Sequence, residues 1–226
     1  MSGRDFFAAR PDGRPKAKIC GITTAEDARE VVAAGADALG INFWPRSKRF
    51  IPLESARAWL PDVEVARVGV FVNATLAEIT AVLDSGLIDY AQLHGDETPE
   101  FAEALAERGL PFIKALGVKD ESSLAGLRDY ATEGILLDAY CPGEYGGVGE
   151  TFDWKLARQV VEQNPDRRVI LAGGLNPGNV AGAVAAVRPF AVDIASGVES
   201  APGVKDIVKV RQLVASLEGS GDPPAG

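Results

Sequence analysis

Cysteine and histidine are scarce in this chain, which has two cysteines and one histidine among its 226 residues. Cys20 and Cys141 lie far apart in the sequence, neither belongs to a Cys-x-x-Cys pair, and the histidine is near neither of them. This usage excludes the closely spaced zinc and redox motifs, so we expect no bound metal and a reducing, cytoplasmic setting.

Positive charge is also in short supply, because 23 Lys and Arg residues stand against 32 Asp and Glu residues, for a formal net charge of −9. Such an excess of negative charge gives no general attraction to nucleic acid or to an anionic membrane, so we expect neither as a partner. Any site for an anion must therefore be local.

The N-terminal stretch "MSGRDFFAARPDGRPKA" lacks the continuous apolar core of a signal peptide, and charged residues are spread along it. The final stretch, "GSGDPPAG", consists mostly of glycine, proline and serine, which cannot bury enough apolar surface to become ordered. We therefore predict a disordered extension over residues 1–16, one folded domain over residues 17–218 and a disordered tail over residues 219–226.

Between these ends, short apolar runs alternate with longer amphipathic segments. The eight runs are "AKICGI" (17–22), "ALGINF" (38–43), "VARVGVFV" (65–72), "YAQLH" (90–94), "PFIKAL" (111–116), "GILLDA" (134–139), "RVILA" (168–172) and "AVDIA" (191–195). Segments such as "TAEDAREVVAAG", "TLAEITAVLDSG" and "TPEFAEALAERG" begin with a threonine that can cap a helix and end with a glycine that can terminate one. The repeat is a strand followed by a helix.

This repeat predicts an α/β fold of a single closed (β/α)8 TIM barrel, in which the helices cover the outside and the sheet has no exposed edge. A doubly wound open sheet is the alternative. The barrel is favoured because Gly-rich stretches, "AGGLNPGN" and "ASGVESAPG", follow the seventh and eighth runs, where barrels of this class bind phosphate. No G-x-G-x-x-G follows the first run.

Polar residues that end apolar strands are candidates for chemistry, because the carboxyl ends of barrel strands form the active face. Four residues have this position: Cys20, His94, Asp138 and Asp193. Side chains alternate along a strand, so Lys18 shares a face with Cys20, Gln92 with His94, and Leu136 with Asp138. We expect these faces to point into the barrel.

Cys20 allows two interpretations, a small buried core residue or a reactive thiol. Gly21, which follows it, would let the backbone approach a ligand closely. Lys18 could supply a positive field that favours the thiolate, or it could instead be occupied by Asp193 across the mouth of the barrel. The sequence leaves this choice open.

Asp138 follows four apolar residues in "GILLD", where desolvation can keep a carboxyl group protonated as an acid. An ordinary turn-capping aspartate is the other interpretation. We expect His94 to support the site, either as a hydrogen-bonding group at the mouth of the barrel or as a residue that contacts the ligand.

The segment "FWPRSKRF" (43–50) gathers three basic residues in an otherwise acidic chain. A basic loop is usually solvated, but this one follows the second strand, so an arginine from it could hold a carboxylate at the mouth. The two Gly-rich loops, each opening toward the N-terminus of a helix, indicate an anion site nearby.

These stretches together resemble the phosphoribosylanthranilate isomerase family of tryptophan biosynthesis. The matching segments are "KICGIT" (18–23), "GADALGINFWPRSKR" (35–49), "VGVFVN" (68–73), "QLHGDE" (92–97), "LLD" (136–138), "YGGVGETFDW" (145–154), "AGGLNPGNV" (172–180) and "RPFAVDIASGVE" (188–199). The resemblance implies a (β/α)8 barrel that isomerises N-(5′-phosphoribosyl)anthranilate to 1-(2-carboxyphenylamino)-1-deoxyribulose 5-phosphate by an Amadori rearrangement. It implies a phosphorylated small-molecule substrate and no metal or nucleotide cofactor, and it fits a monomer or a homodimer.

The resemblance also implies roles for individual residues. Cys20 would be the general base and Asp138 the general acid. Arg49 would hold the anthranilate moiety, and Asp193 and His94 would contact the substrate. The phosphate would be bound by the two Gly-rich loops, which include Gly173, Gly174, Ser196 and Gly197.

Two positions depart from the family pattern. Val148 stands where many relatives have a small hydroxyl residue, and Glu150 where a basic residue is common.

Three other functions remain possible from the sequence. A sugar-phosphate aldolase would use Lys114 as a Schiff-base nucleophile, and a non-catalytic phosphate-binding barrel would need no acid or base. A dual-substrate isomerase of histidine and tryptophan biosynthesis would have an aspartate where this chain has Cys20.

Overall fold

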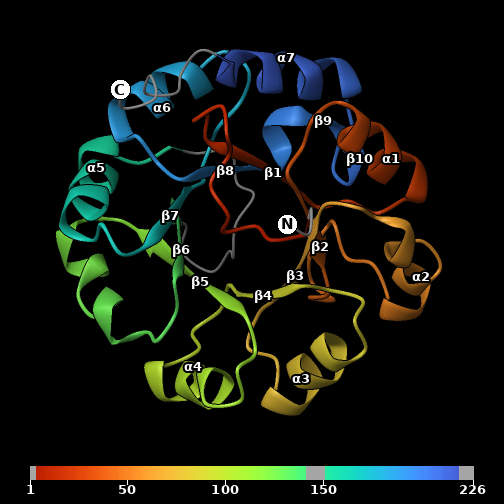
Figure 1. Ribbon diagram of the computed structural model, residues 1–226, viewed down its shortest axis with the longest axis horizontal. Coiled ribbons are helices and arrows are strands. Elements are labelled where there is room, and N and C mark those ends of the chain that lie inside the picture. Colours follow the sequence, from red (N-terminus) through yellow and green to blue (C-terminus); the bar gives the residue numbers. More distant parts are fainter. Residues whose placement is uncertain (1–3, 141–150, 219–226) are drawn as a thin grey trace.

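The structure is a computed structural model that describes residues 4–140 and 151–218. Its centre is a closed barrel of eight parallel strands paired in chain order, with β8 returning to β1 (Figure 1). The strands are β1 (Lys16–Cys20), β2 (Ala38–Asn42), β3 (Ala66–Phe71), β4 (Tyr90–Leu93), β5 (Phe112–Val118), β6 (Gly134–Ala139), β7 (Arg168–Leu171) and β8 (Ala191–Ile194). The predicted (β/α)8 barrel is confirmed, and the open sheet is excluded.

Helices form a ring around the barrel (Figure 1). They are α1 (Ala25–Ala33), α2 (Leu53–Arg57), α3 (Leu76–Asp84), α4 (Pro99–Ala106), α5 (Trp154–Gln163), α6 (Val180–Val187) and α7 (Ile207–Leu217). The prediction of a helix after every strand is wrong after β5, where only the 3₁₀ turns η2 (Glu121–Leu124) and η3 (Leu127–Asp129) occur. Gly126 lies between these turns with a φ of 80°, a left-handed conformation that interrupts a helix.

The threonines and glycines expected to begin and end helices do so in the structure. The side chains of Thr24, Thr75 and Thr98 accept hydrogen bonds from backbone N–H groups in the first turns of α1, α3 and α4. The glycines that follow these helices, Gly35, Gly86 and Gly109, all have positive φ. Local sequence therefore sets where these three helices begin and end.

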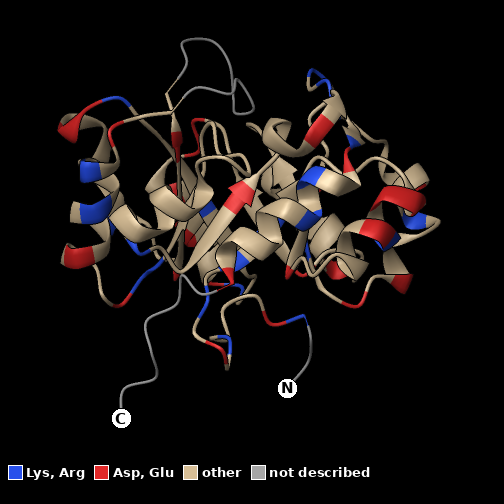
Figure 2. Cartoon of the chain, turned by 90° about the horizontal axis from the view of Figure 1, so that it is seen from above, with Lys and Arg blue, Asp and Glu red and all other residues tan. Residues whose placement is uncertain are grey.

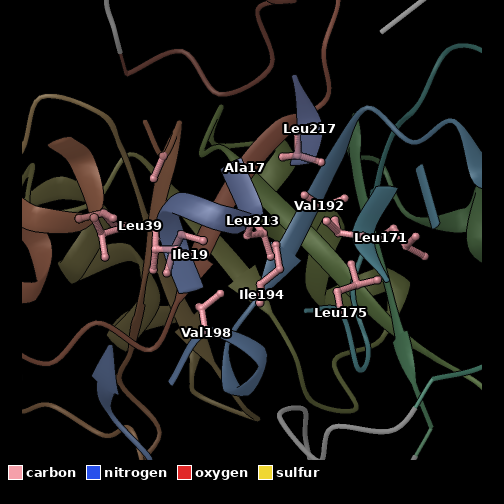
Figure 3. Packing of buried hydrophobic residues seen from close by; sticks show 14 of the residues in the cluster. Ala17, Ile19, Leu39, Leu171, Leu175, Val192, Ile194, Val198, Leu213 and Leu217 are labelled. Atoms are coloured by element: carbon pink, nitrogen blue, oxygen red, sulfur yellow. The ribbon is translucent and has the colours of Figure 1, made fainter. Parts of the chain in front are cut away.

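Each strand has two buried faces, which explains why the strands read as continuous apolar runs. Outward side chains such as Ile19, Val192 and Ile194 pack with Leu213 and Leu217 of α7 (Figure 3). Inward side chains such as Val68, Ile113 and Leu136 fill the barrel itself. The inward set also contains Cys20, His94 and Asp138 by alternation, as expected, so the polar groups lie at the open end.

The first described residues close the opposite end of the barrel. Phe6 is fully buried among inward side chains, and its ring contacts Tyr90 and Phe190 edge-to-face. The backbone N–H of Phe6 donates to the Tyr90 hydroxyl (3.2 Å), and Lys16 Nζ donates to the carbonyl of Asp5 (2.9 Å). The predicted disorder of residues 1–16 is therefore wrong from residue 4 onward, because these aromatic side chains complete the core.

Charges are distributed over the outer helices, with Lys and Arg interspersed among Asp and Glu (Figure 2). Within residues 4–140 and 151–218, none of the helices is both long enough and apolar enough to cross a membrane. The same residues contain no cluster of three or more His, Cys, Asp or Glu side chains suited to a metal ion.

Replacing Phe6 with alanine tests the contribution of the N-terminal segment. We expect Phe6→Ala to lower the free energy of unfolding by about 3–5 kcal/mol, because it empties a fully buried aromatic site. Phe50→Ala is the control, since Phe50 is 37% exposed and its loss should change stability by less than about 1 kcal/mol. Urea unfolding measures both, and equal small effects would show that Phe6 is dispensable.

Candidate active site

The centre of the candidate site is a buried ion pair between neighbouring strands. Lys18 Nζ of β1 lies 2.8 Å from Asp193 Oδ1 of β8, and the two residues are direct register partners. Both side chains are almost completely buried. Lys18 is therefore held by Asp193, which was one of the two arrangements that the sequence left open.

Cys20 is the last residue of the same strand and lies two residues closer to the mouth than Lys18, on the same face. Desolvation raises the pKa of its thiol above the ordinary value of 9.0, although the positive charges of Lys18 and Lys205 favour the thiolate and offset part of the effect. The field of Lys18 thus reaches Cys20 even though Lys18 is paired. The free protein holds Cys20 as a thiol at neutral pH.

Gly40 of β2 provides the room for this thiol. A Cβ at position 40 would lie 2.6 Å from Cys20 Sγ and 2.9 Å from Cys20 Cα, which are distances that real side chains do not adopt. Nothing in the sequence singles out Gly40. Its role depends on the pairing of β1 with β2, in which Cys20 is directly opposite Gly40.

Asp138 is the penultimate residue of β6 and lies beside His94, which follows β4. His94 Nε2 is 3.3 Å from Asp138 Oδ2, and the other carboxylate oxygen accepts a hydrogen bond from the backbone N–H of Ala139 (2.9 Å). Gln92 Nε2 lies 2.7 Å from His94 Nδ1. With the amide donating to Nδ1, the imidazole carries its proton on Nε2 and presents it to Asp138.

Arg49 reaches from the loop after β2 to the start of β9 (Glu199–Ala201), which pairs with β10 (Val204–Lys205). Its Nε and Nη2 atoms donate to the two carboxylate oxygens of Glu199 at 2.8 and 2.7 Å. The stem of Arg49 crosses Gly21, where a Cβ would lie 2.3 Å from Arg49 Cδ. Gly21 is therefore needed for the arginine to pass; close approach of a ligand to its backbone stays a prediction.

The two Gly-rich loops meet at the mouth. Gly173 and Gly174 have φ values of 81° and 60°, and a Cβ at Gly173 would lie 3.3 Å from Asp138 Oδ1. A Cβ at Gly197, which follows Ser196 in the next loop, would collide with the carbonyl oxygen of Leu175. The expected loop residues therefore lie together, next to Asp138, where only glycine allows the backbones to approach so closely.

Lys114 of β5 faces away from the barrel interior, since its neighbours Ile113 and Ala115 belong to the inward cluster. Its Nζ lies 2.8 Å from Glu97 Oε2 and 2.8 Å from the carbonyl oxygen of Gly95, and the side chain is 2% exposed. An amine held in this way cannot attack a substrate at the mouth. The geometry therefore gives no support to the Schiff-base aldolase.

Sequence reasoning assigned no role to three polar residues of this site, Gln92, Glu199 and Lys205. Lys205 Nζ, almost fully buried, donates to the Cys20 carbonyl (2.6 Å) and to Glu199 Oε1 (2.7 Å). Alternation placed Gln92 on the face of His94 and so could have indicated it. Nothing local marks Glu199 or Lys205, because their partners are far away in the sequence.

The fold and this geometry define a (β/α)8 barrel with a thiol, a carboxyl–imidazole pair and two Gly-rich loops at one mouth, an arrangement suited to acid–base chemistry. A family described as "N-(5'phosphoribosyl)anthranilate (PRA) isomerase" matches residues 17–216. The chain is 49% identical over 207 residues to an N-(5′-phosphoribosyl)anthranilate isomerase of Citrifermentans bemidjiense, covering 90% of this chain and 97% of the relative. It is 44% identical over 209 residues to the enzyme of that name from Pseudomonas syringae pv. syringae. The chain belongs to the N-(5′-phosphoribosyl)anthranilate isomerase family.

Solved structures of the family have the same fold. The crystal structure of phosphoribosyl anthranilate isomerase from Thermotoga maritima has a TM-score of 0.80 and 41% identity, covering 91% of this chain and 99% of that chain. A phosphoribosyl anthranilate isomerase in complex with reduced 1-(o-carboxyphenylamino)-1-deoxyribulose 5-phosphate has a TM-score of 0.78 and 39% identity. The resemblance inferred from the sequence is confirmed.

Three residues singled out in the sequence, Cys141, Val148 and Glu150, lie outside the described residues. The segment "YGGVGE" (145–150) lies there too.

The raised pKa of Cys20 predicts how its alkylation depends on pH. In a Cys141→Ala variant, where iodoacetamide can label only Cys20, the labelling rate should rise with pH to a midpoint above 9.0. The thiol form also contributes stability that is present below the unfolded-state pKa and is lost as the pH rises through the folded-state pKa. A labelling midpoint well below 9.0 would show that the positive charges outweigh desolvation.

Proposed function

We propose that this protein catalyses the Amadori rearrangement of N-(5′-phosphoribosyl)anthranilate to 1-(2-carboxyphenylamino)-1-deoxyribulose 5-phosphate, a step of tryptophan biosynthesis. Membership of the isomerase family supports the reaction, and the complex of a relative with the reduced product supports a phosphorylated ligand of this kind. The observation that carries the proposal is the order of the strands. The Gly-rich loops after β7 and β8 lie between Asp138 on β6 and Cys20 on β1, so a sugar phosphate held there has an acid on one side and a thiol on the other.

Asp138 is the general acid in this proposal. Ring opening requires a proton on the furanose oxygen as the bond from that oxygen to C1′ breaks, which leaves an iminium between C1′ and the anthranilate nitrogen. Asp138, in its protonated form, supplies this proton, and His94 Nε2 lies 3.3 Å from its Oδ2. The imidazole N–H then stabilises the carboxylate that remains.

Cys20 is the general base, which removes the proton from C2′ to give the enolamine. A thiol with a raised pKa is a poor base in the free protein, but the C2′ proton is acidified by the adjacent iminium, and Lys18 and Lys205 stabilise the thiolate. Lys18 also holds Asp193 beside the reacting sugar. The enolamine then takes a proton at C1′ and loses one from the C2′ hydroxyl, which yields the ketose.

Arg49 and the glycine loops bind the two ends of the substrate. Arg49 has N–H groups beyond those that Glu199 uses, and in this proposal they hold the anthranilate carboxylate. The backbone around Gly173, Gly174, Ser196 and Gly197 holds the phosphate. Binding at both ends orients the reacting centre between Cys20 and Asp138.

Turnover is measured by following the loss of fluorescence of N-(5′-phosphoribosyl)anthranilate. Comparing the turnover of the wild-type protein with that of Asp138→Asn tests whether Asp138 is the general acid. The amide keeps the shape of the carboxyl group but cannot deliver the proton, so we expect kcat to fall by about 10²- to 10⁴-fold. Product affinity should stay within a few-fold. A loss below about tenfold would remove Asp138 from the acid role.

The base is tested with the two cysteines as an internal comparison. Cys20→Ala should lower kcat by at least about 10²-fold, whereas Cys141→Ala should have little effect. Circular dichroism and thermal unfolding check that both variants fold, since truncating a thiol leaves only a small cavity. A folded Cys20→Ala variant with near-normal kcat would restore the view of Cys20 as a core residue.

A further inference from the structure

Glu199 occupies one edge of the Arg49 guanidinium and leaves the other edge uncommitted. A guanidinium carries five N–H donors in a planar fork, which can face two carboxylates at once. Glu199 uses Nε and Nη2 at 2.8 and 2.7 Å. Within the described part of the chain, Glu199 is the one carboxylate within 4.0 Å of Arg49, so Nη1 and the second N–H of Nη2 are available for another anion.

Glu199 is itself held rigidly. Its Oε1 accepts from Lys205 Nζ (2.7 Å) and from the backbone N–H of Gly203 (3.3 Å), and its backbone carbonyl accepts from Lys209 Nζ (2.8 Å). Only 4% of the Glu199 side chain is exposed, and the neighbouring cations lower its pKa despite burial, so it is a carboxylate at neutral pH. The acceptor that fixes Arg49 therefore does not move.

Two cations share the carboxylate of Glu199. Arg49 Nη2 lies 2.7 Å from Glu199 Oε2, and Lys205 Nζ lies 2.7 Å from Glu199 Oε1. The cluster also contacts the base, since Lys205 Nζ donates to the carbonyl of Cys20 (2.6 Å).

We propose that Glu199 is a positioning residue that sets specificity for the aromatic carboxylate, because it locks one edge of Arg49 and so orients the free edge for the substrate. This inference rests on the proposed function, in which Arg49 binds the anthranilate carboxylate. Glu199 touches no reacting atom and acts through Arg49. Glu199 and the substrate carboxylate hold opposite edges of one guanidinium, and they do not compete for it.

Two probes separate this role from a general structural one. The first is reduced 1-(o-carboxyphenylamino)-1-deoxyribulose 5-phosphate, and the second is the same compound without the ring carboxyl group. We expect Glu199→Gln to weaken the carboxylated probe by about tenfold or more, because the amide replaces one of the two acceptor oxygens by an NH2 donor and no longer fixes the plane of Arg49. The probe without the carboxyl group should change less than about twofold, since it makes no demand on Arg49.

Asp89→Asn is the matched control. Asp89 holds Arg67 by a similar bidentate pair at 3.0 and 2.8 Å, at the N-terminal ends of β3 and β4 and so at the opposite end of the barrel. This variant should be destabilised, because it breaks a largely buried ion pair, yet it should bind both probes with the wild-type ratio. Glu199→Asp, which keeps the charge on a shorter stem, should recover part of the discrimination that Glu199→Gln loses.

Calorimetric titration of the folded variants gives the outcomes. Three results would overturn the role of Glu199: equal weakening of both probes by Glu199→Gln, unchanged binding of both probes, or tighter binding of the carboxylated probe. The third result would mean that Glu199 competes with the substrate.

In the double variant Arg49→Met/Glu199→Gln, discrimination between the two probes should be no lower than in Arg49→Met alone. If the wild-type protein binds both probes equally, the carboxylate assignment of Arg49 fails, and if it does not turn over N-(5′-phosphoribosyl)anthranilate, the proposed function fails.

Discussion

The pairing of β1 with β8 is the constraint on which the site depends. It closes the sheet, and its register sets Lys18 opposite Asp193, so that their ion pair spans the closing seam. The same strand then delivers Cys20 to the mouth two residues later, beside Gly40 of β2. A slip of one residue in this pairing would turn Lys18 and Cys20 outward into the apolar layer under α7 and remove the thiol from the site.

The chemical groups of the mouth come from different strands, and each is oriented by a neighbour that does not react. His94 contacts Asp138, Lys18 contacts Asp193, and Glu199 contacts Arg49. The supporting groups are buried or nearly so, which strengthens their hydrogen bonds relative to water-exposed ones. In the proposed function, this arrangement separates the groups that meet the substrate from those that fix their direction.

Much of the fold could be predicted from the sequence because its signals are local. Strand runs, threonine caps such as Thr75, and the alternation that turns Asp138 inward depend on neighbouring residues alone. Cys20, Asp138 and Arg49 could be located by position and by family resemblance. Contacts between residues far apart in the sequence could not be predicted. Glu199 was missed for this reason, because its partner Arg49 lies 150 positions away.

Burial was the other quantity that the sequence could not supply. Desolvation decides the direction of the Cys20 pKa, and it depends on side chains from several strands. The order of residues 4–15 likewise depends on a pocket that exists only in the closed barrel. The outward direction of Lys114 is a third example, since alternation separates Lys114 from Ile113 and Ala115 but does not tell which face of β5 points inward.

The contacts of Phe6 join segments that are synthesised far apart in time. The rings of Phe6 and Phe7 both contact the ring of Phe190, which is added much later. Until then these two aromatic side chains lack this partner. A chain that stops before β8 therefore leaves apolar surface exposed, of the kind that makes incompletely folded chains prone to aggregate.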